Sequence, residues 1–117
     1  MIIVCLKGGL GNQLLQYAAG RQLAYIHNTI VKLDTTAYYY GGPRRFELSH
    51  FNIQENVAVT AEIRKLTNVK QNKLQKLFHV LTHGHAALSP THIRYNKALY
   101  KADFFKLPDN IYLEGYW

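Results

Sequence analysis

The sequence predicts an α/β domain built on a parallel sheet, and three observations near its start lead to that class. The apolar, β-branched run from Ile2 to Leu6 fits a strand that is buried on both faces. A glycine-rich turn follows directly, and the residues after the turn have helical spacing. A second apolar run from Thr29 to Leu33 completes a β-α-β order, which predicts two parallel strands joined by a right-handed crossover.

The connecting segment is predicted to be a helix from about Asn12 to His27. Apolar residues recur in it at steps of four, four and three, and they are predicted to form the stripe that packs on the sheet: Leu15, Ala19, Leu23 and Ile26. Gly20 lies inside this helix, where glycine costs about 1 kcal/mol relative to alanine. Its presence indicates either a close approach of helix and strand or a tolerated accident.

Later segments carry weaker signals. Three tyrosines at 38–40 precede the turn sequence Gly41-Gly42-Pro43 and are expected on or beside a loop. Their rings either stack on sugars, pack in the core or form a simple surface cluster. Residues 57–59 are expected to form a short strand, with Thr60 as the cap of the next helix. The aromatic segment 110–117 is expected to be a further strand that leaves the sheet unfinished.

Length and composition fit one small domain or part of a larger one. The chain has 117 residues, and no apolar stretch approaches the roughly 20 residues of a membrane-spanning helix. Met1 opens directly into the first strand without a signal-peptide pattern, so a cytoplasmic location is expected. Cys5, the single cysteine, excludes a disulfide within the chain and is expected to be a small core residue.

The net charge of +7 and the pI of about 9.6 favour an anionic partner. Nucleic acid, an anionic membrane surface and a phosphorylated substrate all satisfy this condition. Much of the excess charge lies between Glu62 and Lys76, where apolar residues also recur near helical spacing. The segment is predicted to be a basic amphipathic helix whose basic face is either solvated or in peripheral contact with the inner face of a membrane.

The run from Lys7 to Gln13 is the strongest candidate for a binding site. Its glycines let the backbone come close to a ligand at the N-terminus of the predicted helix, where free N–H groups favour anionic oxygens. Gly9 and Gly11 meet two positions of the dinucleotide fingerprint and Asp34 stands near the ribose-binding position, but Leu14 replaces the third glycine. A Walker-type loop would end in Gly-Lys-Ser/Thr, whereas this loop continues into Asn-Gln.

The segment from Gly8 to Arg21, with the strand before it, resembles the N-terminal signature of the α-1,2-fucosyltransferases of glycosyltransferase family 11. The resemblance continues in the family's order through Lys32 to Asp34, Phe46 to Ile53 and Tyr112 to Trp117. It spans the chain, although residues 62–92 match only loosely.

The resemblance implies a GT-B glycosyltransferase, in which two Rossmann-like domains face a cleft. Such an enzyme transfers L-fucose from GDP-fucose to a galactose hydroxyl of a glycan acceptor, with inversion and without a metal or other cofactor. The residues that match the donor-facing loop, and so are expected to bind donor or substrate, are Gly9, Gly11, Asn12 and Gln13. Arg21 matches the signature by position and is equally expected to have a structural role.

The catalytic base is not assigned by the sequence, because Asp34, Glu47 and Glu114 all lie in family-like segments. Three histidines lie close together in the sequence and could bind zinc if His92 came near: His79, His83 and His85. No cysteine or carboxylate lies beside them, so no metal is expected.

The family's H-x-R-R-x-D motif, whose arginines neutralise the GDP phosphates, is absent; Arg44-Arg45 lacks the flanking His and Asp. Residues 1–117 are therefore interpreted as a partial N-terminal Rossmann-like domain without the C-terminal GDP-fucose-binding domain, and as inactive alone. Two alternatives remain: a non-enzymatic basic nucleotide- or polyanion-binding module, and a minimal dinucleotide-binding domain. No RNA- or DNA-binding signature accompanies the charge, so nucleic acid is not the expected partner.

Overall fold

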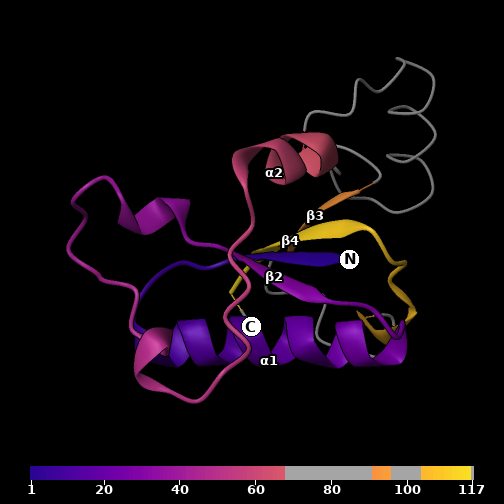
Figure 1. Cartoon of the computed structure of the whole chain (residues 1–117), viewed down its shortest axis with the longest axis horizontal. Helices are drawn as coiled ribbons and strands as arrows, with labels where there is room; N and C mark the ends of the chain where they lie inside the picture. The colour runs from indigo at the N-terminus through magenta and orange to yellow at the C-terminus, as the bar shows by residue number, and fades with distance from the viewer. Residues whose placement is uncertain (68–90, 96–103, 117) are drawn as a thin grey trace.

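The computed structural model describes residues 1–67, 91–95 and 104–116. In these residues four strands form one sheet in the order β2-β1-β4-β3, and every neighbouring pair is parallel (Figure 1). The strands are β1 (Ile2–Cys5), β2 (Val31–Asp34), β3 (His92–Tyr95) and β4 (Ile111–Gly115). The predicted α/β class with a parallel sheet is confirmed, and the arrangement is compatible with a Rossmann-like fold.

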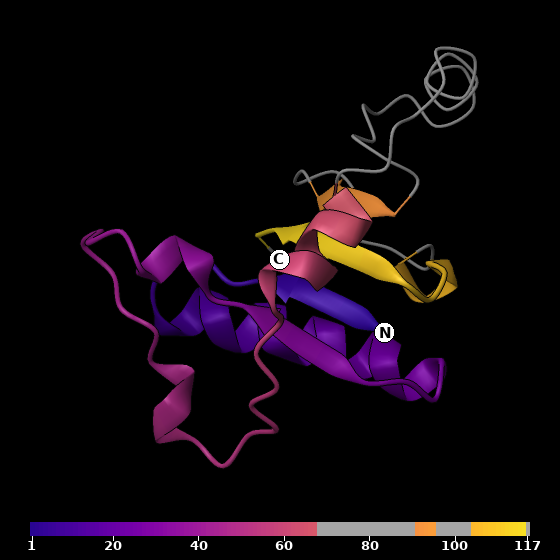
Figure 2. The same ribbon diagram turned by 45° about the horizontal axis from the view of Figure 1, so that its top comes forward.

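Two helices cover opposite faces of the sheet. In Figure 1, α1 (Leu10–Ile26) lies below the strands and α2 (Thr60–Thr67) lies above them. Within the described ranges, three single-turn 3-10 helices lie in the connections: η1 (Thr36–Tyr38), η2 (Leu48–His50) and η3 (Phe104–Lys106). The segment between β2 and α2 extends past the carboxyl ends of the strands before it returns to α2 (Figure 2).

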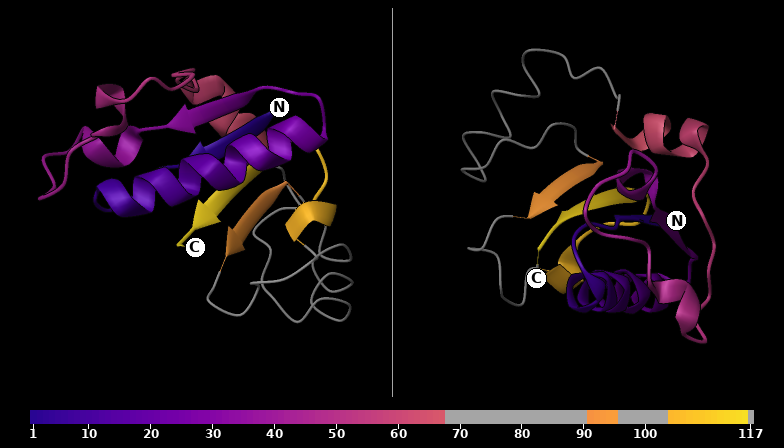
Figure 3. Two further views of the ribbon diagram at one scale, coloured as in Figure 1. Left: turned by 90° about the horizontal axis from the view of Figure 1, so that it is seen from below. Right: turned by 90° about the vertical axis from the view of Figure 1, so that its left-hand side faces the viewer.

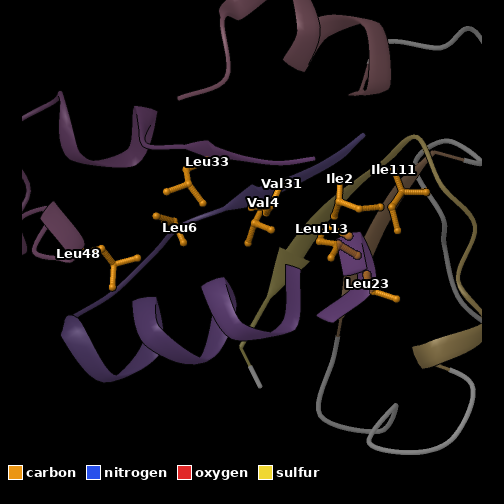
Figure 4. Close-up of a cluster of buried hydrophobic side chains, with 10 residues drawn as sticks. Ile2, Val4, Leu6, Leu23, Val31, Leu33, Leu48, Ile111 and Leu113 are labelled. Carbon is orange, nitrogen blue, oxygen red and sulfur yellow. The ribbon is translucent and has the colours of Figure 1, made fainter. Parts of the chain in front are cut away.

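Strand β1 is buried on both faces, as its apolar sequence predicts. Ile2, Val4 and Leu6 contribute to the core between the sheet and α1, which Figure 4 shows. Ile3 and Cys5 point to the other face and join a second cluster with residues of α2 and β4. Cys5 is thus the small core residue that the sequence predicted, and burial raises the pKa of its thiol.

The face that α1 presents to the sheet differs from the predicted one. Leu23 is buried as expected, but Leu15 is 52% exposed and Ile26 is 43% exposed. The residues that are buried on this helix are Gln13, Gln16, Gly20, Leu23 and Ala24. The prediction was wrong because the solvent-facing side of α1 is as apolar as its packed side, so periodicity alone selected the wrong stripe.

Gly20 allows α1 to lie unusually close to the sheet. A β-carbon at this position would stand 2.2 Å from Cγ2 of Val4 and 3.1 Å from Cγ2 of Val31. No side chain fits into that space without movement of the helix or the strands. Of the two explanations for this glycine, close approach is the one that the packing supports.

Several weaker predictions meet mixed outcomes. The segment 57–59 makes only a single parallel bridge, between Val57 and Leu33, and is not a strand. Thr60 is the first residue of α2 instead of its cap; the Glu62 carboxylate accepts the Val59 N–H at 3.0 Å at that helix start.

The basic sequence beyond Thr67 lies outside the described residues. Among those residues, no helix has both the length and the apolar character needed to span a membrane.

Candidate functional site

The glycine loop lies at the carboxyl ends of the parallel strands. Figure 3 (left) shows the arrowheads of the strands at one end of the sheet, beside the first turn of α1. There the chain leaves β1 to form β2 on one side, whereas β4 occupies the other side of β1. Such a topological switch point opens a crevice in α/β sheets and is where they bind ligands.

Glycine is required at position 8 of the loop. The φ angle of Gly8 is 79°, in the left-handed region, and a β-carbon there would stand 2.6 Å from Nδ2 of Asn12. A β-carbon on Gly9 would come no closer than 3.7 Å to the Arg44 guanidinium, and one on Gly11 would meet nothing within 4 Å. Gly11 therefore leaves uncovered backbone at the start of α1, whereas the Arg44 side chain lies beside the half-buried Gly9.

Gln13 fixes the loop from inside the protein. Its side chain is fully buried, and Nε2 donates to the carbonyl oxygens of Gly8 at 3.1 Å and Arg45 at 2.8 Å. Its Oε1 accepts the backbone N–H of Glu47 at 2.9 Å. Tyr38 adds a hydrogen bond from its hydroxyl to the same Gly8 carbonyl at 3.1 Å. The predicted contact of Gln13 with a ligand stays a prediction, and the observed contacts are all internal.

Gln16 is a second buried glutamine at the site, and sequence reasoning missed it. The backbone N–H of Lys7 donates to its Oε1 at 2.9 Å, and its Nε2 donates to the carbonyl oxygen of Gly115 at 2.9 Å. Gln16 thus joins the carboxyl ends of β1 and β4 across the switch point. The sequence does contain a signal for Gln16, because Gln13, Gln16 and Gly20 lie on one helical face. A face of polar and small residues lacks the apolar periodicity from which a packed face is predicted.

Asn12 and Arg21 occupy different surroundings. Asn12 is half-buried beside Gly8, and its side-chain amide has no hydrogen-bond partner within the described part of the chain. Arg21 lies about 15 Å along the helix from Gly11 and donates to Oε1 of Gln54 at 2.7 Å. Asn12 therefore faces the loop with its amide available, whereas Arg21 ties α1 to the segment after η2.

Glu114, near the carboxyl end of β4, is the centre of an ionic cluster with Lys7, which follows β1, and with His92 and Arg94 of β3. Its Oε1 accepts from Nζ of Lys7 at 2.5 Å, and its Oε2 accepts from His92 Nε2 at 2.8 Å and from Arg94 at 3.1 Å. Burial opposes ionisation of this carboxyl, but the three hydrogen bonds outweigh it and hold the pKa of Glu114 at about 2. The carboxylate is fully paired, and it links β4 to β3 and to the residue that follows the end of β1.

Asp34 is also fully engaged. Its Oδ1 accepts the backbone N–H and the hydroxyl of Thr36 at 2.9 and 2.6 Å, and its Oδ2 accepts the Tyr112 hydroxyl at 2.7 Å. Only 3% of the residue is exposed, and burial raises the pKa of its partner Tyr112. The carboxylate braces the end of β2 against β4 and has no free oxygen for a ribose.

Glu47 differs from these two acids. Its backbone is held by Gln13, and the residue is half-buried at the start of η2. Within residues 1–67, 91–95 and 104–116, no donor contacts its carboxylate.

Tyr39 is 69% exposed and Tyr40 is 90% exposed, which agrees with the loop position predicted for these tyrosines.

The histidine hypothesis falls mostly on residues that the structure does not describe, because His79, His83 and His85 lie outside its ranges. The fourth member, His92, lies on β3 and contacts Glu114. Among the described residues, no group of three or more His, Cys, Asp or Glu side chains is arranged to hold a metal ion.

The chain was also compared with protein-family models, with curated proteins and with solved structures, and it matches none of them.

Proposed function

We propose that this chain forms the glycine-loop wall of a donor cleft in an α-1,2-fucosyltransferase. In this proposal the chain is one Rossmann-like half of a GT-B enzyme that uses GDP-fucose as donor and a galactose-terminated glycan as acceptor, without a metal. The wall consists of Gly9, Gly11 and Asn12 at the start of α1, with Gln13 beneath them.

One observation carries the proposal: three of the four segments that resemble the family contact one another through the first turns of α1. Residues 8–21, 46–53 and 112–117 are far apart in the sequence, yet two glutamines of the first segment bind the other two. Gln13 binds the Glu47 N–H at 2.9 Å, and Gln16 binds the Gly115 carbonyl at 2.9 Å. A resemblance confined to core residues would not require such polar contacts between its parts.

The chemistry of the loop also favours a sugar diphosphate over ATP or a nicotinamide cofactor. The first turn of α1 offers backbone N–H groups, and the Asn12 amide adds a neutral donor that suits a phosphate oxygen or a sugar hydroxyl. Asp34, which a dinucleotide site would need for the ribose, is occupied by Thr36 and Tyr112. The cation-rich H-x-R-R-x-D motif is not in the sequence, so we expect the chain to bind weakly and not to transfer fucose alone.

Backbone amide spectra of the ¹⁵N-labelled chain test the proposal. We expect GDP-fucose to shift the resonances of Gly9, Gly11 and Asn12, with a dissociation constant on the order of 1 mM. Replacing Asn12 by Ala should weaken this response, because the amide donor is lost. The matched control is Gln22→Ala, an exposed amide on the same helix, which should leave the response unchanged.

The same titration separates the alternatives. A single-stranded RNA that binds tightly with a steep salt dependence, in the absence of any GDP-fucose response, would identify a polyanion-binding module. Shifts at the loop with NAD but not with GDP-fucose would identify a dinucleotide-binding domain. Either result would overturn the fucosyltransferase proposal.

A further inference from the structure

We propose that Glu47 is the catalytic base that accepts the proton of the acceptor hydroxyl. The inference rests on the proposed fucosyl transfer and assigns a step that the sequence left open among Asp34, Glu47 and Glu114.

Atoms and charge are conserved in the proposed step. The acceptor oxygen forms a bond to C1 of fucose while the bond from C1 to the diphosphate oxygen breaks, and GDP leaves with that electron pair. The hydroxyl proton passes to the Glu47 carboxylate, which becomes a neutral acid and later releases the proton to solvent. The base must therefore have a free oxygen and must lie beside the loop that holds the diphosphate.

Asp34 and Glu114 fail the first condition. Both oxygens of Asp34 accept hydrogen bonds from Thr36 and Tyr112. Both oxygens of Glu114 accept from cationic or imidazole groups, and a carboxylate held so strongly in its ionised form is a poor proton acceptor at neutral pH.

The other described acids lie elsewhere or are paired. Glu62 binds Lys32 and the start of α2, and Asp109 binds the N-terminal ammonium group. Glu55 precedes Asn56, whose side chain donates to the carbonyl of Val31 at the opposite end of β2. Among the described residues, Glu47 alone combines an unpaired carboxylate with a position at the carboxyl end of the sheet.

Several contacts hold Glu47 beside the glycine loop. Gln13 binds both the Glu47 N–H and the Gly8 carbonyl, so one side chain joins the acid to the loop. The ring of the preceding residue, Phe46, packs at 6.2 Å from the ring of Tyr38, whose hydroxyl donates to the same Gly8 carbonyl. Burial is the main cause that raises the pKa of Tyr38 to about 12, and the Glu47 charge makes a minor contribution in the same direction.

Binding of a galactoside to the full chain tests the assignment, because a base must contact the acceptor before it takes the proton. Lactose is titrated into the ¹⁵N-labelled chain, and GDP-fucose is titrated into a second sample. We expect lactose to shift resonances at Glu47 and Gly8 and to bind about fivefold more weakly to Glu47→Gln, because a charged acceptor becomes a neutral amide. Glu47→Asp, with a shorter reach, should also weaken binding and serves if the first variant folds poorly.

The matched control is Glu55→Gln, which removes an exposed carboxylate elsewhere and should leave lactose binding unchanged. If GDP-fucose shifts the loop but both Glu47 variants bind lactose like the wild type, the base assignment is overturned and the proposed function stands. If neither ligand shifts any resonance, both proposals are overturned.

Discussion

At Gly20 a single missing methyl group sets the distance between α1 and the sheet. We expect Gly20→Ala to destabilise the protein by up to about 2 kcal/mol. The new β-carbon would overlap Val4 and overpacking costs about 1 to 3 kcal/mol, which exceeds the gain of about 1 kcal/mol in helix propensity. Urea unfolding measures the difference.

Gly11 is the matched control on the same helix. A β-carbon there meets nothing within 4 Å, so Gly11→Ala should be neutral or stabilising by up to about 1 kcal/mol. If Gly20→Ala stabilised the protein as much as Gly11→Ala, the close approach of α1 to the sheet would be disproved.

At the scale of one element, α1 shows how far the sequence could predict the fold. The glycine turn and the helical spacing predicted that a helix follows the first strand. They also predicted both ends of that helix to within two residues. Its packed face did not, because Leu15 and Ile26 form an apolar stripe that is regular but exposed. The packed face instead uses Gln13 and Gln16, whose burial depends on partners from distant segments that no local pattern contains.

Two leucines on α1 distinguish the faces experimentally. Leu23 is fully buried, so Leu23→Ala should cost about 2 to 5 kcal/mol through lost contacts and a cavity. Leu15 is 52% exposed, so Leu15→Ala should change the free energy of unfolding by no more than about 0.5 kcal/mol. Equal losses in chemical denaturation would mean that the predicted stripe, and not the observed one, faces the sheet.

For the whole molecule, Glu114 couples stability to pH because it joins β1, β3 and β4. Its pKa is about 2 in the folded protein against an ordinary value of 4.5, so the unfolded chain binds the proton first as the pH falls. The stabilisation is complete above about pH 5 and is lost progressively as the pH falls towards 2. We expect Glu114→Gln to flatten this part of the stability curve, measured as the free energy of unfolding by urea at successive pH values.

Glu55→Gln removes an exposed acid that forms no ion pair with any residue the structure describes, and it provides the control for the acid range. Its stability curve should keep the wild-type slope. Identical slopes for the Glu114 and Glu55 variants would show that the ionic cluster does not form in solution.

The order of the strands explains why the site could be found only in part from the sequence. The glycine loop is local, so its position at a strand end and its Asn12 amide followed from a short motif. Glu114 contacts Lys7 across a separation of 107 residues, and that contact depends on β4 pairing with β1. Strand order is a property of the whole sheet, so no local pattern could bring Lys7, His92 and Arg94 to one carboxylate.

The placement of β1 in the middle of the sheet has a consequence for the order in which the chain is made. During synthesis β1 leaves the ribosome about thirty residues before its partner β2, whereas its partner on the other edge, Ile111 to Gly115, follows much later. Until then Gln16 also lacks its Gly115 acceptor, and one side of an apolar strand stays open. The contacts between the ends of β1 and β4 therefore form only after β4 has been made, so the nascent chain must protect an apolar strand until then.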